Sequence, residues 1–301
     1  RPDLHLMALD MRGHGESTMP SPQRCRGAPE QCFRMADFAA DIVAFLDAKG
    51  FERAYVVGHS LGSIVAQELA LTAPARVERV VLIASTARLA GSVDGFIAGV
   101  IGPWQAAFEA RGGRWPDGAY ELHPRDADPA ADTWIRQTWA FSPVADPALL
   151  AAIARDSMEV PLGTWLGAAR AANGVDNGER LKQLTVPTLV LWSTQDDLLP
   201  EARDQAPLRE SLQAAAAQCR LHFYYKVYGR RPLPEPGTTL DDLGHNLHWE
   251  AVEGVALDLA AYLRDDGAPT RDLYYANPEN PRVVERVSGA ATVIEGGRES
   301  C

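Results

Sequence analysis

Short apolar runs alternate along the chain with longer stretches in which apolar side chains recur every three or four residues. The runs are predicted strands at 4–10, 54–57, 77–83, 186–192 and 221–227, and the periodic stretches are predicted helices at 35–49, 64–72, 201–217 and 249–263. Runs without polar alternation are apolar on both faces, which is typical of parallel strands covered by helices on both sides. The predicted fold class is therefore α/β, with a doubly wound, mostly parallel sheet.

Residues 88–183 interrupt this alternation. They contain Pro and Gly turns, Ala-rich helical stretches near 130–140 and 146–158, and five of the seven tryptophans. We expect a helical cap here, inserted between a first core segment at 1–87 and a second at 184–264. Residues 265–301 form a polar, turn-rich tail with two short β-like pieces at 282–287 and 291–295.

Composition narrows the class of partner. The chain has 301 residues, of which 46% are hydrophobic and 23% charged, as in an ordinary globular protein. Its formal net charge is −11 and it has no Lys/Arg block, so the basic surface expected of a nucleic-acid-binding protein is missing. No apolar run approaches the roughly 18 residues of a transmembrane helix. We expect a small-molecule partner, no nucleic acid and no transmembrane segment.

The first candidate for chemistry is Gly58-His59-Ser60-Leu61-Gly62, between a predicted strand and a predicted helix. This is the pattern of a nucleophile elbow, in which a strained turn exposes a serine hydroxyl. We expect both glycines to be required, because a Cβ at either would collide with neighbouring backbone. The helix N-terminus would present the N–H of Leu61 to a developing oxyanion.

A serine nucleophile needs a base and an acid that orients the base. Asp196 and Asp197 follow the predicted strand at 186–192, and His245 and His248 lie in a Gly-led loop before the last helix. The order Ser60, Asp196, His245 is the one that this type of elbow demands. Asp197 is the alternative acid and His248 the alternative base.

Four motifs together resemble the α/β-hydrolase superfamily, specifically its capped serine esterase and lipase-like branch. They are LDMRGHGES, VVGHSLGS, VPTLVLWSTQDDLLP and LGHNLHWE, between about residues 4 and 263. The resemblance implies Ser60 as nucleophile, Asp196 as acid, His245 as base and the Leu61 N–H as an oxyanion donor. A serine at the elbow argues against the haloalkane dehalogenases and epoxide hydrolases. Asp10, Arg12 and His14 are expected to tie their loop together structurally.

This constellation predicts hydrolysis of a carboxylic ester through an acyl-enzyme, without a metal or organic cofactor. The alternatives are an aminopeptidase or amidase, a thioesterase, an acyltransferase, and a binding protein that has the fold without catalysis. Candidates for contact with an apolar acyl or aromatic substrate are His59, Trp104, Trp134, Trp139 and Trp165. Structural packing is the alternative role for each of them.

Two expectations concern the N-terminus and the cysteines. The family takes its second oxyanion donor from a loop that would precede Arg1, so we expect an upstream segment or a second chain to complete the sheet. Cys25 and Cys32 are seven residues apart in a loop, which favours a disulfide over a zinc site, and Cys219 could pair with Cys301. Such pairs favour a secreted or periplasmic protein; four free thiols in the cytoplasm are the alternative.

Overall fold

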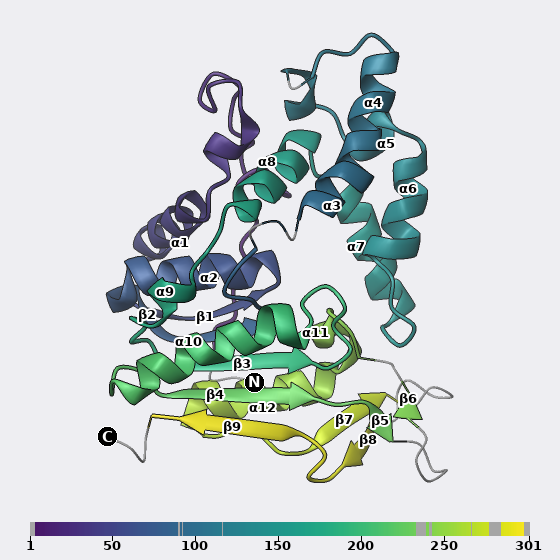
Figure 1. Ribbon diagram of the computed structural model, residues 1–301. Helices are drawn as coiled ribbons and strands as arrows, with labels where there is room; N and C mark the ends of the chain where they lie inside the picture. Colours follow the sequence, from purple (N-terminus) through teal and green to yellow (C-terminus); the bar gives the residue numbers. More distant parts are fainter. Residues whose placement is uncertain are drawn as a thin grey trace. The chain divides into compact units, whose positions relative to one another are not determined.

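The central sheet of the computed structural model has five strands within the described residues, in the order β1-β2-β3-β4-β9 (Figure 1). Strands β1 to β4 are parallel, and β9 runs antiparallel to β4. The strand bounds are β1 Ala54–His59, β2 Val77–Ile83, β3 Thr188–Ser193, β4 Phe223–Tyr228 and β9 Thr292–Gly296. The mostly parallel sheet predicted from the apolar runs is confirmed.

The structure describes residues 4–89, 91, 93–115, 117–232, 239–240, 243–265, 267–276 and 284–297. The chain divides into two units. Unit 1 comprises Arg1–Asp41, Gly91–Phe141 and Leu150–Gly174, and unit 2 comprises Ile42–Ala90, Ser142–Leu149 and Val175–Cys301. The whole five-stranded sheet belongs to unit 2.

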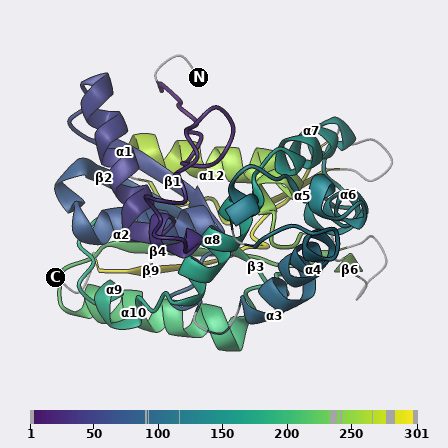
Figure 2. The ribbon, with the colours of Figure 1, turned by 90° about the horizontal axis from the view of Figure 1, so that it is seen from above.

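Helices cover both faces of the sheet in unit 2. Figure 2 shows α10 (Ala206–Ala217) along one face and α12 (Val252–Asp265) along the other. On the α12 face the core contains Val81 and Leu189 from the strands, and Val255 and Tyr262 from the helix. The other elements of unit 2 are α2 (Leu61–Thr72), η2 (Pro74–Arg76), α9 (Gly178–Leu181), η6 (Glu201–Gln205), β5 (Arg231–Pro232), β6 (Thr239–Leu240) and α11 (Leu247–Glu250).

The C-terminal tail contributes more than the two short β-like pieces predicted for it. Its strands are β7 (Leu273–Ala276), β8 (Val284–Val287) and β9. The β7 and β8 strands pair with each other, whereas β9 extends the main sheet beside β4. Leu273 and Tyr275 are buried in the core under α12, so the tail is part of the unit 2 core.

Unit 1 is built from short helices around an aromatic core. Buried Trp104, Ile135, Leu162 and Trp165 lie at its centre. Cys25 and Cys32 form a disulfide, as expected from their spacing, whereas Cys301 lies outside the described residues. The helices wholly within unit 1 are η1 (Pro29–Cys32), α3 (Asp94–Phe96), η3 (Ile97–Ile101), α4 (Gly102–Ala110), η4 (Asp117–Tyr120), α5 (Pro124–Ala127), α6 (Ala130–Trp134), η5 (Ile135–Trp139) and α8 (Leu162–Asn173).

Two helices cross the boundary between the units, α1 (Met35–Lys49) and α7 (Pro147–Met158). The predicted end of α1 is confirmed. Gly50 adopts a φ of 72°, and the Phe51 N–H donates to the Leu46 carbonyl over 2.9 Å. A glycine in the left-handed region with this bond is the Schellman type of helix ending.

The predicted strand at residues 4–10 is wrong. These residues have no regular secondary structure, and Leu6 and Met7 are 80% and 41% exposed. A strand needs a neighbour to accept its backbone hydrogen bonds. No described strand pairs with this segment, so residues 4–10 form no inter-strand hydrogen bonds despite their apolar pattern. Among the described residues, no helix is both long and apolar enough to cross a membrane.

Candidate active site

The turn between β1 and α2 has the geometry of the elbow predicted around Ser60. Ser60 follows the last residue of β1 and precedes the first residue of α2, with φ 51° and ψ −121°. An added Cβ at Gly58 would lie 2.2 Å from the Gly62 carbonyl oxygen, so Gly58 must be glycine. A Cβ at Gly62 would meet nothing within 4 Å. The expected collision at Gly62 is therefore wrong.

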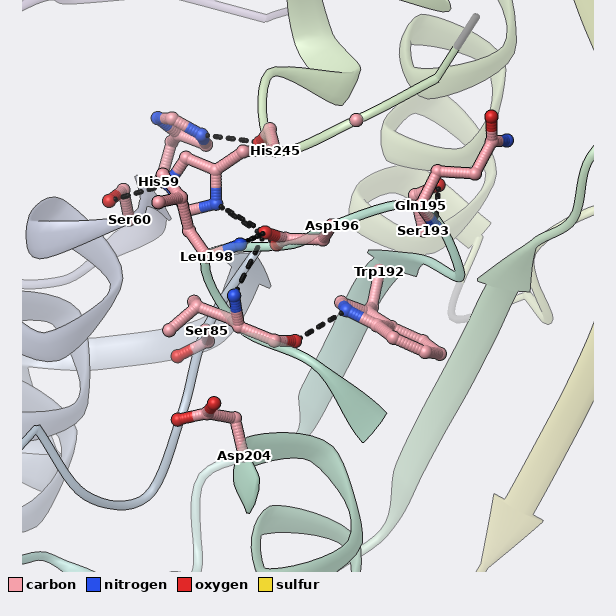
Figure 3. Close-up of polar contacts among 12 residues, drawn as sticks. His59, Ser60, Ser85, Trp192, Ser193, Gln195, Asp196, Leu198, Asp204 and His245 are labelled. Atoms are coloured by element: carbon pink, nitrogen blue, oxygen red, sulfur yellow. Dashed lines mark hydrogen bonds and ion pairs between the residues drawn. The ribbon is translucent and has the colours of Figure 1, made fainter. Parts of the chain in front are cut away.

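The structure brings Ser60, His245 and Asp196 together in one hydrogen-bonded line (Figure 3). The Ser60 Oγ lies 2.8 Å from His245 Nε2. His245 Nδ1 lies 3.0 and 2.9 Å from the two carboxylate oxygens of Asp196. Since a carboxylate can only accept, Nδ1 carries the proton and Nε2 is free to accept from the serine hydroxyl.

The loop after β3 distinguishes the two candidate acids. Asp196 is 2% exposed, and its Oδ1 accepts the backbone N–H groups of Leu198 and Leu199 at 3.1 and 3.0 Å (Figure 3). The neighbouring Asp197 is exposed. The carboxylate that contacts His245 is thus also the one that its own loop holds in place.

Side chains from three elements hold the loop that carries His245. The Ser193 hydroxyl donates to the Leu243 carbonyl at 2.7 Å, and Glu250 accepts the Gly244 N–H at 2.6 Å. His59 Nε2 lies 2.9 Å from the His245 carbonyl and donates to it. Three consecutive residues are therefore fixed through their backbone groups, which limits how far the imidazole can move.

His59 and His248 form an uncharged aromatic support beside His245. The His59 ring centroid lies 5.0 Å from that of His245 and 4.2 Å from that of His248. Burial, reinforced by the two other histidines, holds the pKa of His59 well below its ordinary value. Burial and the proximity of His245 lower the pKa of His248 to about 4. The alternative base His248 packs on His59, whereas His245 contacts the serine.

The predicted substrate-contact tryptophans cluster together inside unit 1. Trp165 contacts Trp104 and Trp139 with ring centroids 5.6 and 4.8 Å apart, and Trp134 lies 6.4 Å away. Trp139 is the most exposed of them, at 42%. Trp104, Trp134 and Trp165 thus belong to the aromatic core of unit 1, and Trp139 lies at its exposed edge; a role of the four in substrate contact stays a prediction.

Sequence reasoning missed the residues that hold the three site residues in place. Ser193, Glu250 and Gln205 are buried and hydrogen-bonded to the loops of the acid and the base. Ser193 and Glu250 lie within the motifs quoted for the acid and the base but were given no role there, and Gln205 lies outside every motif. Of the three, only Ser193 could have been identified from its position in the sequence, because it ends the strand that precedes the acid loop. Among the described residues, no group of three or more His, Cys, Asp or Glu side chains is arranged to hold a metal ion.

The model of the α/β-hydrolase fold family matches residues 2–224. The chain belongs to this family. The matched range includes β1, the Ser60 turn and the acid loop, and it ends within β4.

The α/β-hydrolase relatives differ in their named activities. RutD of Variovorax paradoxus, named as a candidate carbamate hydrolase, is 34% identical over 65% of this chain and 65% of its own length. The dihydrolipoyllysine-residue acetyltransferase component of the acetoin cleaving system of Cupriavidus necator is 30% identical over 67% of this chain and 47% of its own length. The chain thus spans about half to two thirds of the length of these curated relatives.

A solved structure agrees in fold. The esterase EaEST from Exiguobacterium antarcticum superposes with a TM-score of 0.57 at 16% identity, covering 85% of this chain and 80% of its own. At 16% identity, this similarity supports a shared α/β-hydrolase fold and nothing more specific.

Proposed function

We propose that this α/β-hydrolase is a serine hydrolase that cleaves a carboxylic ester through an acyl-enzyme on Ser60. The observation that supports it is the 2.8 Å contact between Ser60 Oγ and His245 Nε2, with Asp196 bonded to the other ring nitrogen. This is the arrangement that turns a weak hydroxyl into a nucleophile.

Each residue has a defined part in the proposed reaction. Ser60 Oγ attacks the ester carbonyl while its proton passes to His245 Nε2, and Asp196 stabilises the resulting imidazolium. The Leu61 N–H, at the start of α2, donates to the oxyanion. His245 then protonates the departing alcohol, which leaves the acyl group on Ser60. A water molecule, deprotonated by His245, releases the carboxylic acid and restores the serine.

The relatives widen the range of substrates to be tested. A carbamate differs from an ester in a nitrogen on the carbonyl carbon, and an acyltransferase replaces the water by another acceptor. The same three residues can serve each reaction, because all of them pass through an acyl or carbamoyl group on the serine. RutD, as the more identical of the two relatives, makes the carbamate the second candidate.

The test is a panel of p-nitrophenyl esters, p-nitrophenyl carbamates, thioesters and aminoacyl anilides, combined with fluorophosphonate labelling. We expect ester turnover and labelling of Ser60. Ser60→Ala, His245→Ala and Asp196→Ala should each lower kcat at least about a thousandfold, because the three act as a unit. The exposed Asp197→Ala is the matched control and should keep wild-type kcat.

Three outcomes would overturn parts of this proposal. Anilide or carbamate turnover without ester turnover replaces the substrate class. A large loss in Asp197→Ala reassigns the acid. Absence of both turnover and labelling in the wild-type protein leaves a binding protein that has the fold without catalysis.

A further inference from the structure

Gln205, the last residue of η6, carries a fully hydrogen-bonded side-chain amide beside the acid loop. It is 0% exposed. Its Nε2 donates to the carbonyl oxygens of Ser85 and Leu199, each at 3.0 Å, and its Oε1 accepts the Tyr225 hydroxyl at 2.6 Å. A buried amide with both donors and its acceptor engaged has one low-energy orientation.

The surrounding groups determine which way this amide points. The carbonyl oxygens of Ser85 and Leu199 can only accept, and the Gln205 Oε1 that lies against the Tyr225 hydroxyl can also only accept. The phenol must therefore give its own proton to Gln205 Oε1. Burial raises the pKa of Tyr225, so the phenol keeps that proton throughout the working range of an enzyme. The Nε2 donors consequently face the two carbonyls.

On one side, Gln205 acts on the peptide that holds Asp196. The Leu199 carbonyl accepts Gln205 Nε2 and also the Trp192 indole N–H, each at 3.0 Å. The N–H of the same residue, Leu199, donates to Asp196 Oδ1. Both the N–H and the C=O of Leu199 are thus hydrogen-bonded. Rotating the peptide groups on either side of Leu199 would break the bond to the Asp196 carboxylate.

On the other side, Gln205 is joined to the Ser60 turn. Ser85, whose carbonyl it holds, lies just after β2, and the Ser85 and Ser63 hydroxyls are 2.7 Å apart. The Ser63 hydroxyl is in turn 2.6 Å from the Ser60 carbonyl. A single side-chain amide therefore connects the acid loop with the serine turn through the buried residues Ser85 and Ser63.

We propose that Gln205 is a positioning residue that fixes the Asp196 carboxylate relative to Ser60 by holding the Leu199 and Ser85 carbonyls. This inference rests on the proposed serine hydrolase function and deepens it. Gln205 has no contact with the reacting atoms and acts through Asp196. Losing this support should lower kcat and leave KM nearly unchanged, because the catalytic groups lose alignment while the substrate site is untouched.

The experiment compares Gln205→Met, which preserves length and removes all three bonds, with Tyr225→Phe, which leaves the two Nε2 donors in place. We expect an about 10- to 100-fold lower kcat for Gln205→Met, KM within about twofold, and an intermediate loss for Tyr225→Phe. Tyr228→Phe is the matched control. Tyr228 is a buried phenol on the same strand that bonds Asp258 instead, and its loss should leave kcat unchanged.

A double-mutant cycle separates positioning from general damage to the structure. In an Asp196→Ala background, Gln205→Met should change the residual kcat by less than about twofold, because the group it aligns is gone. An equal loss in both backgrounds overturns the inference, as does wild-type kcat in folded Gln205→Met. If wild-type protein lacks Ser60-dependent turnover and labelling, the proposed function fails first. Circular dichroism at the assay temperature verifies that each variant is folded.

Discussion

Ser60 and Ala84 are strained residues at the carboxyl ends of neighbouring strands β1 and β2. Both are non-glycine residues with positive φ, 51° and 47°. Such a conformation costs about 1–3 kcal/mol and persists only where surrounding bonds enforce it. Here the Ser60 N–H donates to the Ile83 carbonyl at 3.0 Å, and the Ala84 N–H donates to the Leu191 carbonyl at 2.9 Å. The sheet therefore stabilises the turn that exposes the Ser60 hydroxyl.

The two elbow glycines should respond differently to alanine. Gly58→Ala places a methyl group 2.2 Å from the Gly62 carbonyl oxygen, and a backbone atom there cannot move aside cheaply. We expect a large loss of folded protein. Gly62→Ala adds its methyl group in open space within a helix, where alanine is favoured over glycine by about 1 kcal/mol.

Thermal unfolding of both variants tests this difference. The Tm of Gly62→Ala should equal or exceed that of the wild-type protein, and the Tm of Gly58→Ala should be far lower. A marked drop in Gly62→Ala would show that the space seen beside Gly62 is not available.

The sequence predicted the candidate site residues better than their surroundings. The contact among Ser60, Asp196 and His245 could be predicted because the chemistry proposed for them constrains both the residue type and the chain order. The sequence does not distinguish Asp196 from Asp197, or His245 from His248, because which side chain faces Ser60 depends on hydrogen bonds within each loop. Gln205 could not be found, since its partners Ser85 and Tyr225 become neighbours only in the folded sheet.

At the scale of elements, the loop 243–245 depends on the neutral form of its histidine support. His59 donates to the His245 carbonyl while packing on His248. Protonating either supporting histidine would place an uncompensated charge in a buried aromatic group. We therefore expect the stability of this loop to depend on pH.

The sign of this pH dependence follows from the lowered pKa values. Histidines in the unfolded chain titrate near about 6.5, whereas the pKa of folded His248 is about 4 and that of His59 is also lowered. Between these values the unfolded chain binds more protons. The histidine contribution to stability is therefore complete above about pH 7 and is lost as the pH falls toward 4.

Urea unfolding at pH 7.5 and 5.0 tests this with His248→Phe, which keeps an aromatic ring but cannot titrate. The decrease in unfolding free energy between the two pH values should be smaller in the variant by about 1–2 kcal/mol. An unchanged decrease would mean that His248 is equally easy to protonate in both states.

Elements were predictable where their pattern was local. Helix α1 and strands β2 and β3 lie close to their predicted ranges, because apolar periodicity and a terminal glycine are properties of the segment itself. Residues 4–10 have a strand-like composition without a described strand to pair with. Strand β9 shows the converse case. It is a short piece in a polar tail, and it joins the main sheet because β4 has a free edge with which it can pair.

At the scale of the whole molecule, a buried ion pair joins the sheet, a helix and the tail of unit 2. Lys226 on β4 and Asp258 on α12 are both 0% exposed, and their Nζ and Oδ2 atoms lie 2.6 Å apart. Lys226 Nζ also donates to the Asp272 carbonyl in the tail at 3.0 Å. Tyr228 and the Thr270 N–H complete the shell of Asp258. No other described ion pair has both side chains fully buried.

Breaking this pair from one side should destabilise the protein strongly. Lys226→Met leaves the Asp258 carboxylate buried without its cation, a situation that typically costs about 3–5 kcal/mol. Lys226→Met combined with Asp258→Asn removes both charges; the asparagine oxygen can still accept the Thr270 N–H, and its NH2 group can donate to the Tyr228 hydroxyl oxygen, so most of the lost stability should return. Urea unfolding of the single and double variants measures this coupling. If the double variant were as unstable as Lys226→Met, the loss would come from disrupted packing between sheet, helix and tail, and the buried charge would not be its cause.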